Sequence, residues 1–163
     1  MSSQTVTDVR QRGKAAVALL GLLLGAALSC PALGAALAVN PQTGLAISGF
    51  DPGAYFTDAK PEAGRPDLEL SADGAVWRFR NEGNRAAFAA HPDIYRPAFG
   101  GYDPVGILRS RSVPGHPQLW AVAGGRLYLF YSADSRAEFL AHPAGVLGRA
   151  EHAWPVVQRT TAR

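Results

Sequence analysis

Two aspartates occupy matching positions in the sequence and are the first side chains that could do chemistry. Asp51 and Asp103 each follow a glycine and an aromatic residue, and each precedes a proline. Two carboxylates at one site could hold a metal ion or act as a general acid and base. An Asp-Pro pair is also typical of a helix start, with Asp as the N-cap and Pro as the first helical residue. We expect the capping role for Asp51, whereas both roles are open for Asp103 on its glycine-rich loop.

Two histidines also match. His91 and His142 each end an Arg-x-x-Phe-x-x-His-Pro motif. Imidazole binds metals and titrates near neutral pH, so His91, Asp51 and Asp103 are candidate ligands of a divalent metal ion. In the last turn of a helix, imidazole can instead donate to free carbonyl groups and suits the helix dipole. Because the whole motif is repeated, the structural role is favoured for both histidines.

The other candidates for ligand binding lie on the same two loops. Tyr55, Gly101 and Tyr102 could line a pocket with the two aspartates, although half-buried tyrosines are ordinary core residues. The sequence has no H-E-x-x-H, G-x-S-x-G, paired-cysteine or phosphate-loop motif. No reaction is therefore indicated, and a binding protein is favoured over an enzyme.

These residues belong to an internal repeat. Residues 73–92 align without gaps onto residues 124–143, with eight identical pairs, and a Gly-aromatic-Asp-Pro turn lies upstream of each copy. The repeat predicts two half-domains, each with a turn, a hairpin and a helix. A final helix is predicted over residues 145–154, ended by Pro155. Together these features predict an α+β fold, with the two half-domains around one core.

Turn and strand patterns support the hairpins. Asp73-Gly74 and Gly124-Gly125 fit two-residue type I′ turns, which need positive φ at both positions. Aromatic and charged residues alternate over residues 77–80, which predicts a half-buried strand. Residues 127–130 are apolar throughout. The second hairpin should therefore be central or covered on both faces, and the first hairpin more exposed.

Each hairpin leads into a predicted helix. Asn81 and Ser132 are good N-caps at equivalent positions. Both helices should stop near His91 and His142, because the following proline disfavours helical backbone before it. Residues 57–66, rich in proline and glycine, are expected to form a surface loop.

The first residues have the features of an export signal. A basic stretch is followed by an apolar run over residues 15–28, and Ala36-Leu37-Ala38 fits a signal-peptidase site. We predict cleavage after Ala38. Residues 1–38 are then a signal peptide, residues 39–163 one domain, and the protein periplasmic or secreted.

Two alternatives for the leader stay open. It could remain as an N-terminal anchor, or Cys30 could be lipidated, although the residue spacing and Pro31 argue against lipidation. The apolar run is shorter than the roughly 20 residues that a membrane span needs. No transmembrane domain is therefore expected after cleavage.

Net charge and cysteine content limit the kinds of partner and metal site that the domain can have. Cleavage takes three basic residues and one acidic residue from totals of 16 and 13, which leaves a net charge of about +1. We therefore expect no nucleic-acid binding. The only cysteine leaves with the leader, which excludes disulfides and thiolate metal sites in the domain. We expect a monomer that could dock to a protein of the cell envelope.

The chain resembles the YHS-domain proteins of the bacterial periplasm, a family that includes selenoproteins. The resemblance implies an exported α+β domain that is suspected of binding metal and has no defined activity. It covers nearly all of residues 39–163 in order. The segments that carry it are residues 46–56, Trp77-Arg-Phe, Asn84-Arg-Ala-Ala-Phe88, residues 91–102, Pro114-Gly-His-Pro-Gln-Leu-Trp120 and Gly125-Arg-Leu-Tyr-Leu129.

One departure from the family bears on function. Asp103 stands where the family commonly has cysteine or selenocysteine, so any metal would have to be held by oxygen and imidazole. The leading hypothesis is a non-enzymatic binding or accessory domain of the periplasm. One alternative is a small-molecule enzyme with Asp103 as general base. The other is an interaction module that docks through the exposed arginines Arg78 and Arg80.

Overall fold

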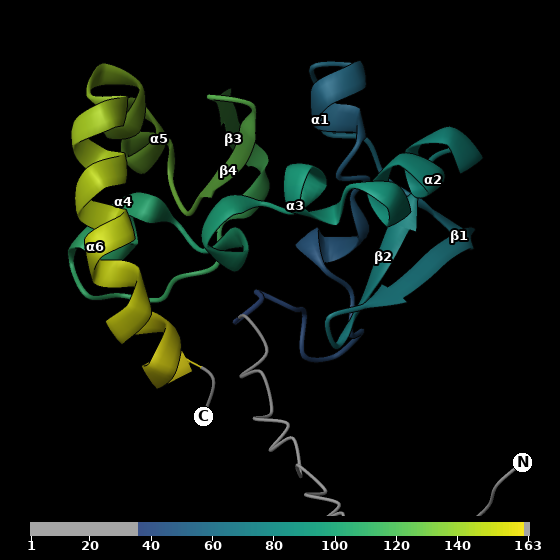
Figure 1. Ribbon diagram of the computed structural model, residues 1–163, viewed down its shortest axis with the longest axis horizontal. Helices are drawn as coiled ribbons and strands as arrows, with labels where there is room; N and C mark the ends of the chain where they lie inside the picture. Colours follow the sequence, from purple (N-terminus) through teal and green to yellow (C-terminus); the bar gives the residue numbers. More distant parts are fainter. Residues whose placement is uncertain (1–35, 162–163) are drawn as a thin grey trace, which may run out of the picture. The chain divides into compact units, whose positions relative to one another are not determined.

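The computed structural model describes residues 36–161, and the predicted basic and apolar parts of the leader lie outside them (Figure 1). The predicted α+β class is confirmed. The first half contains a 3-10 helix η1 (Ile47–Gly49), helix α1 (Ala54–Thr57), strands β1 (Arg65–Ala72) and β2 (Ala75–Phe79), and helices α2 (Glu82–Ala90) and α3 (Pro92–Tyr95). The second half contains η2 (Ala98–Gly101), α4 (Pro104–Leu108), β3 (His116–Ala123), β4 (Arg126–Phe130), α5 (Ala133–Ala141) and α6 (Pro143–Thr161).

The two halves therefore have the same order of elements, as the aligned sequence segments predict. That they are superposable copies of one unit stays a prediction. Within residues 36–161, no helix is long and apolar enough to cross a membrane.

Each half contains one antiparallel hairpin. β1 pairs with β2 and β3 pairs with β4, in two separate two-stranded sheets. The turn residues have positive φ, 54° at Asp73 and 75° at Gly74 in the first hairpin, and 56° at Gly124 and 72° at Gly125 in the second. This is the backbone that a type I′ turn requires. Because a lone hairpin is marginally stable in water, both depend on the helices that pack on them.

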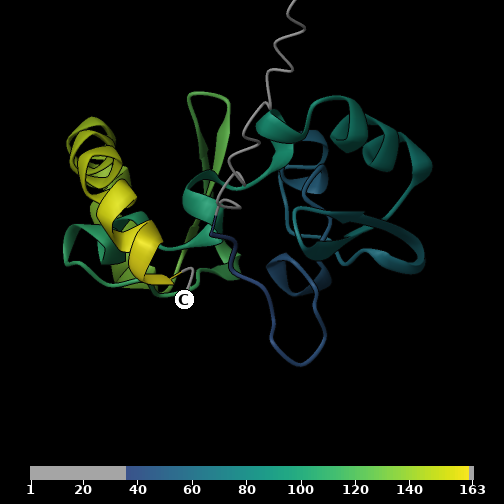
Figure 2. The same cartoon turned by 60° about the horizontal axis from the view of Figure 1, so that its bottom comes forward.

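Strand β4 lies between two hydrophobic clusters. Leu127 and Leu129 pack into one cluster with Trp77 of the first half, and Tyr128 and Phe130 pack into another with Phe139 of α5. Both views show β3 and β4 between α6 and the first hairpin (Figure 1 and Figure 2). The expectation that this strand is covered on both faces is confirmed.

The helix ends follow the predicted capping residues. The Asn81 side chain accepts a hydrogen bond from the Asn84 amide at 2.8 Å, and Ser132 accepts one from the Ser135 amide at 3.1 Å. Helices α2 and α5 end one residue before His91 and His142, respectively, which are their C-caps. The proline after each histidine opens the next helix instead of a loop.

Two predicted boundaries are wrong. Helix α6 does not end at Pro155 but continues through it to Thr161. A proline inside a helix costs about 3 kcal/mol, and burial of Ala150 before it and Val157 after it offsets this cost. The predicted loop over residues 57–66 also runs too far, because β1 begins at Arg65. The pairing of β1 is irregular there, with a register shift between Arg65 and Glu69, which accommodates a proline.

Candidate binding site

Asp51 is fully buried and uses both carboxylate oxygens within the first half. Its Oδ1 accepts the Gly53 amide at 2.7 Å. Its Oδ2 accepts the Arg80 amide at 2.8 Å and the Asn84 side-chain amide at 2.7 Å. The carboxylate therefore ties the turn before α1 to the end of β2 and the start of α2.

Asp103 makes the matching contacts in the second half. It is the N-cap of α4, where Oδ1 accepts the Val105 amide at 2.9 Å. Its Oδ2 accepts the Tyr131 amide, just after β4, at 3.2 Å. The side chain is 1% exposed. Asp103 thus holds a loop to a strand end, as Asp51 does.

The expected metal ligands do not form a site. Both aspartates have their charge compensated by converging N–H donors, and His91 is an exposed helix C-cap. Among residues 36–161, no group of three or more His, Cys, Asp or Glu side chains could hold a metal ion. A metal bound through Asp51 or Asp103 would have to displace buried hydrogen bonds. The residues present do not fit the divalent ion that the sequence suggested.

The two candidate tyrosines are core residues. Tyr55 donates its hydroxyl to the Pro117 carbonyl at 2.9 Å and packs edge-on against Trp120, so it joins the two halves. Burial raises the pKa of Tyr55 well above its usual range, and the nearby Asp51 carboxylate adds to this. Tyr102 is also buried, beside Trp154. Burial raises the pKa of Tyr102 as well.

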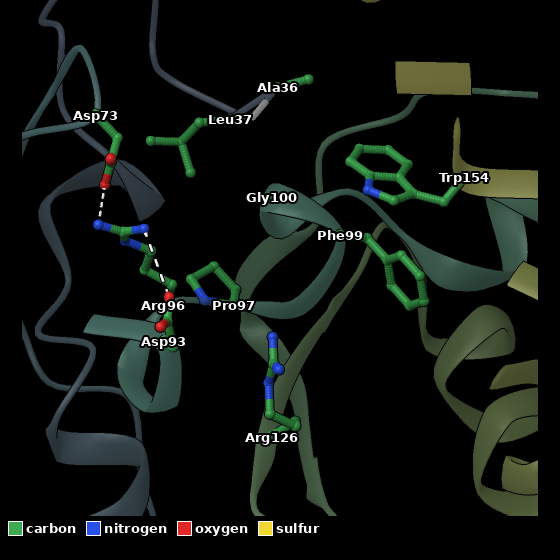
Figure 3. Close-up of a pocket in the computed structure, with 10 residues that line it drawn as sticks. All are labelled: Ala36, Leu37, Asp73, Asp93, Arg96, Pro97, Phe99, Gly100, Arg126 and Trp154. Carbon is green, nitrogen blue, oxygen red and sulfur yellow. Dashed lines mark ion pairs between the residues drawn. The ribbon is translucent and has the colours of Figure 1, made fainter. Parts of the chain in front are cut away.

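One cavity opens beside the Gly100 loop and has a volume of about 290 Å³ (Figure 3). The rings of Phe99 and Trp154 lie on one side, with their centroids 5.8 Å apart. A smaller cavity next to it includes Gly101, which is the only one of the predicted ligand-binding residues to line either of these two cavities. The cavity beside Gly100 is lined by Ala36, Leu37, Asp73, Asp93, Arg96, Pro97, Phe99, Gly100, Arg126 and Trp154.

Two arginines of this cavity differ in their partners. Arg96 forms an ion pair with Asp73 at the tip of the first hairpin. Its Nη1 also lies 3.9 Å from Oδ1 of Asp93. Its Nε is buried and has no hydrogen-bond acceptor among the described residues. Arg126, at the start of β4, has no ion pair within residues 36–161. Figure 3 shows its guanidinium pointing into the cavity between Pro97 and Phe99.

Sequence reasoning missed these cavity residues. The usable signal lay in the repeat, where Arg126 aligns with Ala75. An arginine that replaces a small residue in one copy only has no role in the shared framework. Trp154 lies beyond the aligned segments, so the repeat could not mark it.

Comparisons with protein-family models, curated proteins and solved structures found no match to this chain. The function must therefore be inferred from the cavity and its residues.

Proposed function

We propose that this chain is an exported, non-enzymatic binding or accessory domain, similar to YHS-domain proteins, whose binding site is the cavity beside Gly100. One observation carries the proposal. Arg126 has no carboxylate partner in the described part of the chain and points into a cavity with aromatic walls. Convergence of a charged group on a mostly apolar concavity is the usual form of a ligand site.

The chemistry of the walls defines the class of ligand. A guanidinium group binds carboxylates through paired N–H donors. Phe99 and Trp154 offer flat apolar surface beside it. The ligand is thus a small anion with an aromatic or apolar body, or a side chain of this kind on a partner. With Ala36 and Leu37 as part of the wall, the volume is about 290 Å³, just below the roughly 300–1,000 Å³ of ordinary ligand pockets. Cleavage after Ala38 would open that part of the wall, whereas Phe99, Arg126 and Trp154 would stay.

An enzyme with Asp103 as base has less support. Both oxygens of Asp103 accept backbone hydrogen bonds, and its side chain is not part of the cavity wall. A general base must reach the proton that it removes.

Docking through the arginine face also has less support. Arg78 pairs with Glu69 at 2.8 Å, and Arg80 pairs with Asp58. Both arginines that this docking surface would use, Arg78 in β2 and Arg80 just after it, are thus already paired with carboxylates of the same half.

The test is a titration of the protein with phenylacetate, in which binding is measured by Trp fluorescence and by calorimetry. Phenethylamine, which has a similar shape and the opposite charge, is the control ligand. We expect phenylacetate to bind and phenethylamine not to bind. Arg126→Gln should weaken phenylacetate binding by about tenfold or more, because a carboxylate loses its charged partner.

Arg111→Gln is the matched control variant. Arg111 is an exposed arginine outside the cavity, so this variant has the same net charge as Arg126→Gln and should bind like wild type. If both variants lost the same affinity for phenylacetate, the loss would come from the change in net charge and not from Arg126 itself. No binding of phenylacetate at millimolar concentration would overturn the proposed anion site.

A further inference from the structure

Residues 36–38 lie along the domain in a groove beside Gly100. The Ala38 amide donates to the Gly100 carbonyl at 2.8 Å. Ala36 is 8% exposed, and Figure 3 shows Ala36 and Leu37 across the cavity from Arg126. Ala36 belongs to a buried hydrophobic cluster with Tyr102, Ile107, Ala150 and Val157.

Gly100 lets a backbone approach this surface closely. Its φ is +61°, and a Cβ there would collide with the Ala36 carbonyl oxygen and lie 2.9 Å from the carbonyl carbon. The turn glycine Gly124 has a similar φ of +56°, but a Cβ there would meet nothing within 4 Å. The groove is therefore shaped for a peptide main chain and not only for a side chain.

The predicted cleavage after Ala38 would remove all three of these residues. The Gly100 carbonyl would then lose its hydrogen-bond donor, and the apolar wall at Tyr102 and Trp154 would lose its cover. A main-chain acceptor next to an apolar groove is what extended peptides use when they add to a protein surface. Cleavage would thus open a groove that a short stretch of this chain occupies in the structure.

We propose that, in the processed protein, this groove binds an extended segment of an exported partner protein, made of small and aliphatic residues. The bound segment takes the position of residues 36–38, donates an amide to the Gly100 carbonyl, and places a small residue against Tyr102. The groove shares Phe99, Gly100 and Trp154 with the anion cavity but does not use Arg126.

The test begins with the processed protein, purified from the envelope of cells that express the full chain. Intact mass first gives its N-terminus, which we expect at Val39. The probe is a peptide of residues 34–38, acetylated and amidated so that it carries no carboxylate, and its binding is followed by Trp fluorescence. Gly100→Ala should weaken its binding by about tenfold or more. Gly124→Ala, which introduces the same residue at a similar φ, should leave it unchanged.

Arg126→Gln separates this proposal from the anion site. It should leave binding of the uncharged peptide unchanged while it weakens phenylacetate binding. An N-terminus upstream of Ala36 in the purified protein would mean that residues 36–38 still fill the groove, and this result would overturn the proposal. Absence of peptide binding, or equal binding by wild type and Gly100→Ala, would overturn it as well.

Discussion

Asp51 and Asp103 show what a buried carboxylate does when amide donors surround it. Each closes a loop onto a strand end that lies far along the chain, at Arg80 for the first and at Tyr131 for the second. The Asp-Pro pattern favoured the capping role for Asp51 and left it open for Asp103. The structure has the reverse: Asp103 is the N-cap of α4, whereas the N-cap of α1 is Gly53 and Asp51 lies before it, accepting the Gly53 amide. The second set of hydrogen bonds depends on tertiary structure, so sequence could not decide between cap and ligand.

Removal of either carboxylate should destabilise the domain strongly. We expect Asp103→Ala and Asp51→Ala each to lower the free energy of unfolding by about 2–4 kcal/mol, because buried amides lose a charged acceptor. Urea denaturation measures the change. Asp134→Ala, at an exposed position in α5, is the control and should cost about 1 kcal/mol or less.

Unfolding in the presence of added metal ions tests whether the carboxylate of Asp103 is instead a metal ligand. If Mn(II), Ni(II) or Zn(II) raised the unfolding midpoint of wild type but not of Asp103→Ala, the carboxylate would be a ligand and the structural role assigned to it would be wrong.

Tyr55 should make the domain sensitive to alkaline pH. Burial raises its pKa in the folded state, whereas the unfolded chain releases the proton near pH 10. Stability is therefore present below about pH 10 and falls as pH rises above it, by up to about 1.4 kcal/mol per pH unit for one proton. Tyr55→Phe should flatten this fall and cost about 1 kcal/mol at neutral pH.

Urea unfolding at several pH values measures the slope. Tyr131→Phe, at a tyrosine that is 63% exposed, should keep the slope of wild type. An identical alkaline slope in wild type and Tyr55→Phe would show that the folded-state pKa of Tyr55 is not raised.

At the scale of elements, local residues decide some features and packing decides others. The hairpin turns, the N-caps and the helix ends at His91 and His142 were predictable, because each depends on residues within one turn of the chain. The predicted helix end at Pro155 was wrong, because the packing of α6 on both sides of the proline outweighs the tendency of proline to end a helix. Alternation in β2 and its absence in β4 correctly predicted which hairpin is covered on both faces.

The difference between the two hairpins should appear in truncation variants. Arg78 and Leu129 occupy aligned positions in β2 and β4, but Arg78 is half-buried in a surface ion pair and Leu129 is 1% exposed. We expect Leu129→Ala to lower the free energy of unfolding by about 2–5 kcal/mol and Arg78→Ala by about 1 kcal/mol or less. Equal losses in denaturant unfolding would contradict the central position of β4.

At the scale of the whole molecule, the candidate site is assembled from distant segments. Pro97 to Gly100, Arg126 and Trp154 belong to the η2 region, β4 and α6, respectively. The α+β class followed from sequence, because patterning shows which elements form. The site did not, since no periodicity tells which loop, strand start and helix meet around a cavity. The repeat drew attention to the shared framework, while the cavity uses residues that the two halves do not share.

The anion site also makes the most direct test of the account. We would record amide and indole NMR spectra of the ¹⁵N-labelled protein during titration with phenylacetate. The proposed function predicts that the largest shifts fall on the Trp154 indole and the amides of Gly100 and Arg126, with little change at Val105 and Tyr131. Shifts centred on Val105 and Tyr131, whose amides donate to Asp103, would show that the ligand binds at Asp103. That result would contradict a binding site in the cavity beside Gly100.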